Sequence, residues 1–256
     1  MMVFAHADDE TLLAGALISK LVSDGHEVRV LCLAPGDGDR VRRLRGACAD
    51  LGVSEVETLR FVESRMWPND AGTPSESPTA RLNLQISLVP STELARKIAG
   101  RISESAPDIV LTHSSYGDYG NSDPAAAFQA TRLAVESVDG ESISFCSLEW
   151  SRWVVRINVR LMRVGGRSIR KMGPDGSFDL ALALNRPNSP TISIDVSSEL
   201  GVRRKASRLY RTEIAKRPLP MRLLEWVPLI LQRSFLGKAK LRVELTPERF
   251  DQTSGF

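Results

Sequence analysis

The N-terminal stretch constrains the fold most, because an apolar run ends there in a cluster of polar side chains. The run ends at His6, three carboxylates follow at positions 8–10, and residues 11–21 have the pattern of an amphipathic helix. This order predicts a strand, a polar turn and a helix. In an open α/β sheet such a turn lies at the carboxyl edge of the strands, which is where these folds bind ligands. We therefore expect the histidine and the carboxylates to lie at a functional site.

Two interpretations of this turn are open from its residues alone. His6 and Asp9 are three residues apart, so both side chains can reach one ion, and Asp8 between them is free to hold a water molecule. Imidazole and carboxylate are ordinary zinc ligands, and a catalytic zinc site has three protein ligands and one open position. The structural alternative is that Asp8 and Asp9 cap the following helix, whose N-terminus favours negative charge, while His6 only packs.

Strands and helices alternate along the first 149 residues. The pattern predicts strands over 26–33, 55–61, 109–112 and 142–148, and helices over 40–51, 91–105 and 125–137. Such alternation implies a parallel sheet with right-handed crossovers, so the predicted fold class is α/β, a Rossmann-like doubly wound sheet. Residues 67–90 contain four prolines and read as a long irregular loop, a kind of segment that often forms a lid.

The pattern changes from residue 150 onward. Residues 153–164 alternate, and 168–172 and 178–184 are strand-like, which predicts a β-hairpin layer. A further strand over 191–196 and helices over 198–215 and 219–235 follow, the last broken by a proline. We expect one domain over residues 1–256, with a Rossmann-like core over 1–149 and a β-hairpin and helical extension over 150–256.

Composition narrows the functional classes. The chain has a net charge of only +3, and no apolar run of the length that crosses a membrane. Seven basic residues between 203 and 217 are more typical of a solvated helix face than of a nucleic-acid surface. No signal-peptide pattern begins the chain, and Cys32, Cys48 and Cys146 are an odd, widely spaced set, so we expect a cytoplasmic protein with buried, reduced thiols.

Residues 5–10, Ala-His-Ala-Asp-Asp-Glu, with Thr-Leu-Leu-Ala-Gly-Ala-Leu after them, resemble the A-H-P-D-D-E opening of the PIG-L/LmbE-like zinc deacetylases. The resemblance implies that His6 and Asp9 bind zinc and that Asp8 is the general base. Ala7 stands where the family has proline. Residues 191–196, with Lys205, Ala206 and Tyr210, resemble the closing segment of the family. Residues 63–66, Glu-Ser-Arg-Met, loosely resemble a D-S-G-M segment of some members.

The second motif of the family departs from its pattern in this chain. Family members carry an H-P-D-H box, whose last histidine is the third zinc ligand, whereas residues 121–124 read Asn-Ser-Asp-Pro. Pro124 has no ligand atom. Either His113, at the end of the neighbouring strand, or Asp123 completes the site, or the chain binds metal weakly or not at all. We also expect Ser122 or Asp123 to cap the helix that begins here.

The predicted function is that of a metal-dependent hydrolase that removes an N-acetyl or N-acyl group from an amino sugar or glycoconjugate. The resemblance implies zinc, with Asp8 as the base on a metal-bound water and Asn121 or Tyr119 as donor to the oxyanion. The alternative is a catalytically silent relative that binds a sugar-like ligand or a protein partner, because its third ligand is lost. The expected partner is an N-acetylated small molecule and not nucleic acid, and the oligomeric state stays open.

Overall fold

The computed structural model describes residues 1–64, 85–138, 142–150, 152–166, 168–171, 179–184, 192–216 and 225–246. The described strands form a seven-stranded sheet in the order β3-β2-β1-β4-β5-β7-β6. They are β1 (Met2–His6), β2 (Arg29–Ala34), β3 (Glu55–Thr58), β4 (Ile109–Thr112), β5 (Ser144–Glu149), β6 (Ile192–Asp195) and β7 (Lys238–Leu245). Strands β1 to β5 are parallel, and β7 pairs antiparallel with both β5 and β6. The predicted doubly wound, mainly parallel α/β sheet is confirmed.

The strand order reverses between β1 and β4. Strands β1, β2 and β3 run outward in one direction, whereas β4 pairs with the other side of β1 through Met2 and Leu111. The chain therefore leaves β1 and β4 toward opposite faces of the sheet. At such a switch point the two loops open a crevice at the carboxyl edge. The loop after β1 carries the acidic turn, and the loop after β4 carries the altered second motif.

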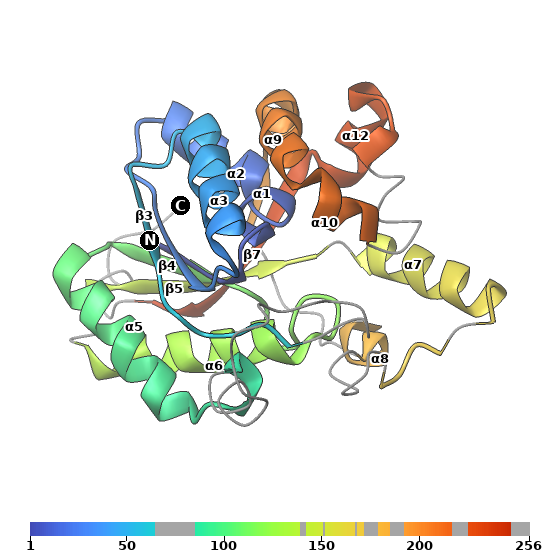
Figure 1. The fold of residues 1–256 in the computed structure, drawn as a ribbon. Helices are drawn as coiled ribbons and strands as arrows, with labels where there is room; N and C mark the ends of the chain where they lie inside the picture. The colour runs from blue at the N-terminus through green and yellow to red at the C-terminus, as the bar shows by residue number, and fades with distance from the viewer. Residues whose placement is uncertain are drawn as a thin grey trace, which may run out of the picture.

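Helices cover both faces of the sheet (Figure 1). One layer contains α1 (Asp9–Leu12), α2 (Gly15–Ser23), α3 (Gly38–Leu51) and α9 (Leu200–Ser207), and the other contains α5 (Ser91–Ser105) and α6 (Ser122–Ser137). Successive residues of β1 point to alternate faces, so Met2 and Phe4 join one hydrophobic cluster and Val3 and Ala5 the other. With both faces covered, β1 and β2 read as nearly continuous apolar runs.

The predicted β-hairpin layer after residue 150 is wrong where it was placed. Residues 152–164 form helix α7 (Arg152–Val164), 180–184 form helix α8 (Leu180–Leu184), and 168–171 form no strand, while 172–178 lie outside the described residues. Val155 and Val159 are four residues apart and both are buried, and Arg156 and Arg160 are exposed with the same spacing. This helical period explains the pattern better than alternation does.

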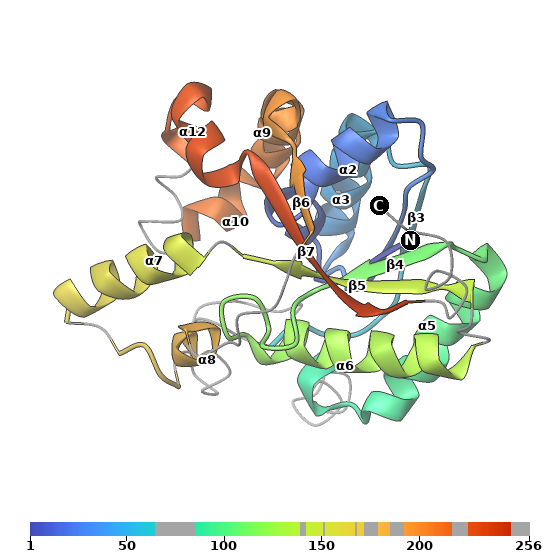
Figure 2. The same cartoon turned by 180° about the vertical axis from the view of Figure 1, so that it is seen from behind.

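Antiparallel strands do occur in the extension, but they are β6 and β7, which the helices α9, α10 (Arg211–Lys216) and α12 (Leu229–Leu236) separate in sequence. Figure 2 shows both strands extending the edge of the sheet beside β5. Strand β7 was not predicted. The expected strand over 191–196 and the break at Pro228 agree with β6 and with the start of α12.

Other predictions have mixed outcomes. The helix predicted over 11–21 is two helices, α1 and α2, with Leu13 and Ala14 between them. The proposed lid over 67–90 lies mostly outside the described residues, apart from the short helix η1 (Ile86–Leu88) and its flanks. The three cysteines are buried and unpaired, as expected. None of the helices described is both long and apolar enough to span a bilayer.

Candidate active site

The acidic turn lies directly at the end of β1, and its first carboxylate occupies an unusual backbone conformation. Asp8 has φ 109° and ψ −22°, and its side chain makes no capping hydrogen bond to α1. Asp9 does not cap the helix either, because its Oδ2 accepts the backbone N–H of His6 at 2.9 Å. Both side chains are buried. Asp8 thus occupies the N-cap position, but neither carboxylate caps α1 by a hydrogen bond, and positive φ at a non-glycine residue points to a functional constraint.

The side chain of Glu10 holds the backbone of Asp8, the residue with positive φ, in place. Its Oε2 accepts the backbone N–H of Asp8 at 2.8 Å, and its Oε1 accepts the hydroxyl of Thr11 at 2.7 Å. The side chain is fully buried, and burial raises the pKa of Glu10 to about 7. Glu10 is thus a structural carboxyl group that fixes the conformation of Asp8.

His6 lies between carboxylates on both sides of its ring. Nε2 is 3.0 Å from Oδ2 of Asp123, whereas Nδ1 faces Oδ2 of Asp9 at 3.7 Å and Oε1 of Glu63 at 3.8 Å. Burial lowers the pKa of His6, but Glu63, Asp123 and Asp9 together raise it to about 10. The surroundings of this ring therefore favour positive charge strongly.

Asp123 is held in place by the altered second motif. Asn121, and not Ser122 or Asp123, caps α6, because its Oδ1 accepts the backbone N–H of Asp123 at 3.0 Å. The Asp123 carboxylate then accepts the backbone N–H groups of Ser64 at 2.6 Å and of Ser87 at 3.1 Å, as well as facing His6. Burial acts to raise the pKa of Asp123, but the contacts with His6 and Ser64 outweigh burial. The net effect is that the pKa of Asp123 is lowered. Asp123 joins α6 and the segments around residues 64 and 87 to His6.

His113 reaches the same region at the end of β4, but both its ring nitrogens are already engaged. Nε2 accepts the backbone N–H of Ala5 at 2.8 Å, and Nδ1 lies 2.6 Å from Oδ2 of Asp118. Asp118 is held in turn by the backbone N–H and the hydroxyl of Ser114. Nε2 is 3.5 Å from Asp9, yet its lone pair points at Ala5. The geometry therefore disfavours His113 as third metal ligand, and this residue joins β1 to β4.

A partly buried arginine balances part of the negative charge. Arg40, in the first turn of α3, donates to Oε2 of Glu63 and to the backbone carbonyl of Ala7 at 2.8 Å, and its Nη2 is 3.8 Å from Oδ1 of Asp8. Burial lowers the pKa of Arg40, but Glu63 and Asp8 raise it well above its usual value. The first turn of α3 thus brings a cation to the site.

Two glycines shape the loop that follows β4. Gly117 has φ +71° and Gly120 has φ +87°, and a Cβ at either would lie 1.9 Å from a backbone oxygen, of Asn121 and of Asp179 respectively. Only glycine fits such close backbone approaches. Tyr119, between them, packs edge-on against Trp150 at 6.3 Å between ring centroids. The loop is therefore compact, and it brings Tyr119 to the end of β5.

The site fits a metal ion only in part. In the described part of the chain, no group of three or more histidine, cysteine, aspartate or glutamate side chains is already arranged to hold one. Pro124 offers no donor atom, and Asp123 lies on the opposite ring nitrogen of His6 from Asp9. His6 Nδ1 and Asp9 are the right kinds of donor for zinc and face each other, so they fit two corners of such a site.

Comparison with known proteins agrees with this architecture. Residues 1–135 match the family model described as "PIG-L: GlcNAc-PI de-N-acetylase". The chain belongs to the PIG-L family. A 1D-myo-inositol 2-acetamido-2-deoxy-alpha-D-glucopyranoside deacetylase from Rhodococcus opacus is 27% identical to it over 85% of this chain and 82% of the relative. The match thus extends well beyond the family segment into the C-terminal extension.

Solved structures share the fold at lower identity. N,N'-diacetylchitobiose deacetylase from Pyrococcus horikoshii superposes with a TM-score of 0.55 at 17% identity, covering 100% of this chain and 86% of that one. The zinc-inhibited form of teicoplanin deacetylase superposes with a TM-score of 0.56 at 17% identity, covering 95% of this chain and 99% of that one. At these identities the likeness establishes the PIG-L fold.

The sequence alone did not identify several residues of this PIG-L site. Arg40 and Asp118 belong to no motif, and Glu10 ends the first motif without a role assigned to it, although the buried acidic turn requires a cation nearby and Arg40 lies in the first turn of a helix at the same sheet edge. Glu63 was visible only through the loose resemblance of its segment. The three-dimensional fold was needed to place Arg40, Glu10 and Glu63 beside His6 and Asp8, and Asp118 beside His113.

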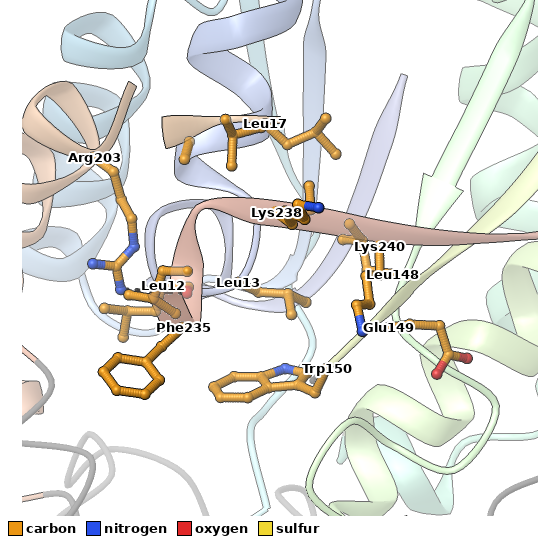
Figure 3. Close-up of a pocket in the computed structure, with 14 residues that line it drawn as sticks. Leu12, Leu13, Leu17, Leu148, Glu149, Trp150, Arg203, Phe235, Lys238 and Lys240 are labelled. Carbon is orange, nitrogen blue, oxygen red and sulfur yellow. Dashed lines mark hydrogen bonds between the residues drawn. The ribbon is translucent and has the colours of Figure 1, made fainter. Parts of the chain in front are cut away.

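A separate pocket adjoins the site on the side of the extension (Figure 3). Its apolar walls come from Leu12 and Leu13 at the end of α1, from Trp150 after β5, and from Phe235 of α12. Strand β7 contributes Lys238 and Lys240 to the lining. The ring of Trp150 also touches Tyr119. This pocket therefore lies next to the loop that carries the second motif, and it contains none of the residues around His6.

Proposed function

We propose that this PIG-L family protein is a deacetylase that hydrolyses the acetamide of an N-acetylated amino sugar, with Asp8 as the general base. The observation that carries the proposal is the buried carboxylate of Asp8, held with φ 109° at the switch point of the sheet and not used as a helix cap. Strain of this kind persists where the surrounding structure imposes it, and it collects at active sites.

Each neighbour of Asp8 has a distinct task in this proposal. Asp8 takes a proton from the water molecule that attacks the amide carbonyl, and the same group returns it to the leaving amine. Arg40 orients the carboxylate of Asp8 from 3.8 Å away. Asn121 uses its Oδ1 in the helix cap, which leaves its amide nitrogen as the donor for the developing oxyanion. Tyr119 is the second candidate donor.

A divalent ion, zinc by family resemblance, would be held by His6 and Asp9. When bound, such an ion supplies Lewis-acid polarisation of the carbonyl and lowers the pKa of water toward neutrality. Asp123 orients His6 through Nε2, in the manner of the carboxylate groups that support metal-binding histidines. Asp9 and Asp123 therefore each have a role in this proposal, and neither role requires a ligand at position 124.

The substrate class comes from the relatives. The Rhodococcus opacus relative is named for an acetamido sugar joined to inositol, and the Pyrococcus horikoshii protein for N,N'-diacetylchitobiose. Both names describe an N-acetylglucosamine unit, which makes such a unit the best first test for this chain. The fold alone does not support a choice of substrate, because one fold hosts many functions.

The test is hydrolysis of the inositol-linked and the chitobiose substrates, measured as free amine released, with purified protein and added zinc. Asp8→Asn should lower turnover by about 10² to 10⁴, the usual contribution of a general base. The matched control is Asp24→Asn, which changes an exposed aspartate at the end of α2 and should leave turnover unchanged. Equal turnover in wild type and Asp8→Asn would refute the mechanism, and no turnover in wild type would favour the ligand-binding alternative.

A further inference from the structure

We propose that the C-terminal extension binds the surface of a membrane that contains anionic lipids, through the exposed sides of α7 and α12. Charge is distributed very unevenly along the chain. Residues 1–149 contain 13 basic and 22 acidic side chains, a net charge of −9, whereas residues 150–256 contain 21 basic and 9 acidic ones, a net charge of +12. Such asymmetry between two parts of a chain is typical of proteins that bind nucleic acid or a membrane. The inference goes beyond the proposed deacetylase activity and does not depend on it.

Helix α7 presents positive charge along one side. At about 100° per residue, Arg156, Arg160 and Arg163 lie within about 60° of one another around the helix, and all three are exposed. Residues 151–172 contain seven basic residues and no aspartate or glutamate. The charge of these arginines is therefore not balanced by acidic neighbours on their own helix.

An apolar stripe runs beside the arginines of α7. Leu161 is 48% exposed and Val164 is 88% exposed, and both lie on the side of the helix opposite to the buried Val155 and Val159. The helix packs against α8, so its position is fixed by the buried side while the other sides face outward. A basic stripe next to an exposed apolar stripe is typical of a helix that lies in the interface of an anionic bilayer.

Helix α12 has the reverse of the pattern expected for a helix that faces water. Its Gln232 is fully buried, whereas Ile230 is 73% exposed and Leu231 is 54% exposed. Trp226, shortly before the helix, is 83% exposed. A surface helix normally buries its apolar residues and exposes its polar ones. Exposed tryptophan and aliphatic side chains are the groups that enter the boundary between lipid headgroups and acyl chains.

Both helices lie at the edge of the sheet that carries the active site. Helix α7 begins shortly after β5 ends at Glu149, and α12 ends just before β7 begins at Lys238. Lys240 of β7 pairs with Glu149, so the start of β7 lies at the carboxyl end of β5. Figures 1 and 2 show α7 extending outward from this edge, with α12 on the same side of the molecule. A bilayer bound by both helices would therefore face the edge at which Asp8 lies.

The exposed apolar side chains favour lipid over nucleic acid as the partner. The phosphates of DNA and RNA attract arginine through charge. That attraction gives no reason to expose Val164, Trp226 and Ile230 beside the arginines. A bilayer offers anionic headgroups to the arginines and hydrocarbon to the apolar side chains, so it matches both features of this surface.

The test is cosedimentation of the full-length protein with lipid vesicles. Wild type should bind vesicles of phosphatidylcholine with about one-third phosphatidylglycerol, and it should bind vesicles of phosphatidylcholine alone much more weakly. Each basic side chain near an anionic surface strengthens binding about fivefold. The triple variant Arg156→Gln/Arg160→Gln/Arg163→Gln should therefore bind the anionic vesicles about 100-fold more weakly.

The matched control removes the same charge from the other part of the chain. Arg42→Gln/Arg101→Gln/Arg132→Gln changes three side chains on α3, α5 and α6 that are 75%, 38% and 47% exposed, and it should bind within about twofold of wild type, because their charges are screened at a distance. Trp226→Ser with Ile230→Ser keeps every charge and should weaken binding about tenfold or more, because apolar burial is lost.

The outcomes decide between lipid, nucleic acid and neither. Absence of wild-type binding to the anionic vesicles would overturn the inference, as would equal binding by the α7 variant and its matched control. Binding to a DNA duplex as tight as to vesicles, and unchanged by Trp226→Ser with Ile230→Ser, would also overturn it in favour of a nucleic-acid partner. The comparison of the two kinds of vesicle uses wild type only, so it decides the question even if a variant fails to fold.

Discussion

Replacing Glu10 by glutamine should stabilise the protein at alkaline pH relative to wild type, but not at acid pH. Glu10 is fully buried, and burial raises its pKa from 4.5 to about 7. Between these pH values the folded chain holds a proton that the unfolded chain has released, so stability falls as pH rises. Each pKa unit is about 1.4 kcal/mol, so this group removes about 3 kcal/mol between pH 4 and pH 8. The neutral amide has no such dependence.

Urea unfolding of both proteins at pH 4.5 and pH 8 measures the effect. The glutamine side chain accepts only one of the two hydrogen bonds from Asp8 and Thr11, which costs the same at either pH. The difference between variant and wild type should therefore shift by about 3 kcal/mol in favour of the variant from low to high pH. Glu93→Gln, on the exposed face of α5, should show no such shift. A constant difference between wild type and Glu10→Gln would refute the buried-charge reasoning.

Three further outcomes are expected. Gly120→Ala should unfold the loop after β4, because the new Cβ would lie 1.9 Å from the carbonyl oxygen of Asp179. The free energy of unfolding, from thermal or urea denaturation, should fall by more than about 3 kcal/mol. Gly25→Ala is the control, since Gly25 has a similar φ but lies in open space, and it should cost only about 1 kcal/mol. Zinc at 100 times its Kd should raise stability by about 2.7 kcal/mol, seen as a higher Tm that excess chelator reverses. His113→Ala should lower Tm while one zinc equivalent still binds; loss of zinc together with a normal Tm would mean that this histidine is a ligand after all.

The sequence predicted the central part of the fold well because its signals there are local. Strand β4 and helix α5 have the predicted boundaries, and the apolar runs of β1 and β2 are typical of strands covered on both faces. The extension was harder, since residues 152–164 have a mixed pattern that fits two periods. Only the burial of Val155 and Val159 on one side distinguishes the helix from a strand.

The sequence predicted where the site lies in the fold but not how its side chains are arranged. The switch point of a doubly wound sheet locates the acidic turn from sequence. The pairing of Asp123 with Nε2 of His6, and of His113 with Ala5, depends on how β1, β4 and α6 pack, and these contacts span more than 100 residues of the chain. No local sequence pattern carries that information, so the role of each histidine follows only from the three-dimensional fold.

The altered second motif keeps its structural function although its histidines are gone. Asn121 caps α6, and Asp123 holds both His6 and the segments at Ser64 and Ser87. The structural contacts of Asn121 and Asp123 are therefore enough to explain their presence, which gives only weak support for catalytic activity. Asp8 gives stronger support for catalysis than Asn121 and Asp123 do, because a helix cap does not require an aspartate at φ 109°.

A comparison of Asp8→Gly with Asp8→Ala tests whether that strain is real. Both variants delete the carboxylate and whatever it binds, so their difference isolates the backbone. Left-handed conformations cost a residue with Cβ about 1–2 kcal/mol, and glycine adopts them freely. Asp8→Gly should therefore be the more stable variant by about 1 kcal/mol or more in urea unfolding, although glycine is normally the less favourable of the two. If alanine proves equal or better, position 8 is relaxed in solution, and the retention of aspartate there loses its value as a sign of catalysis.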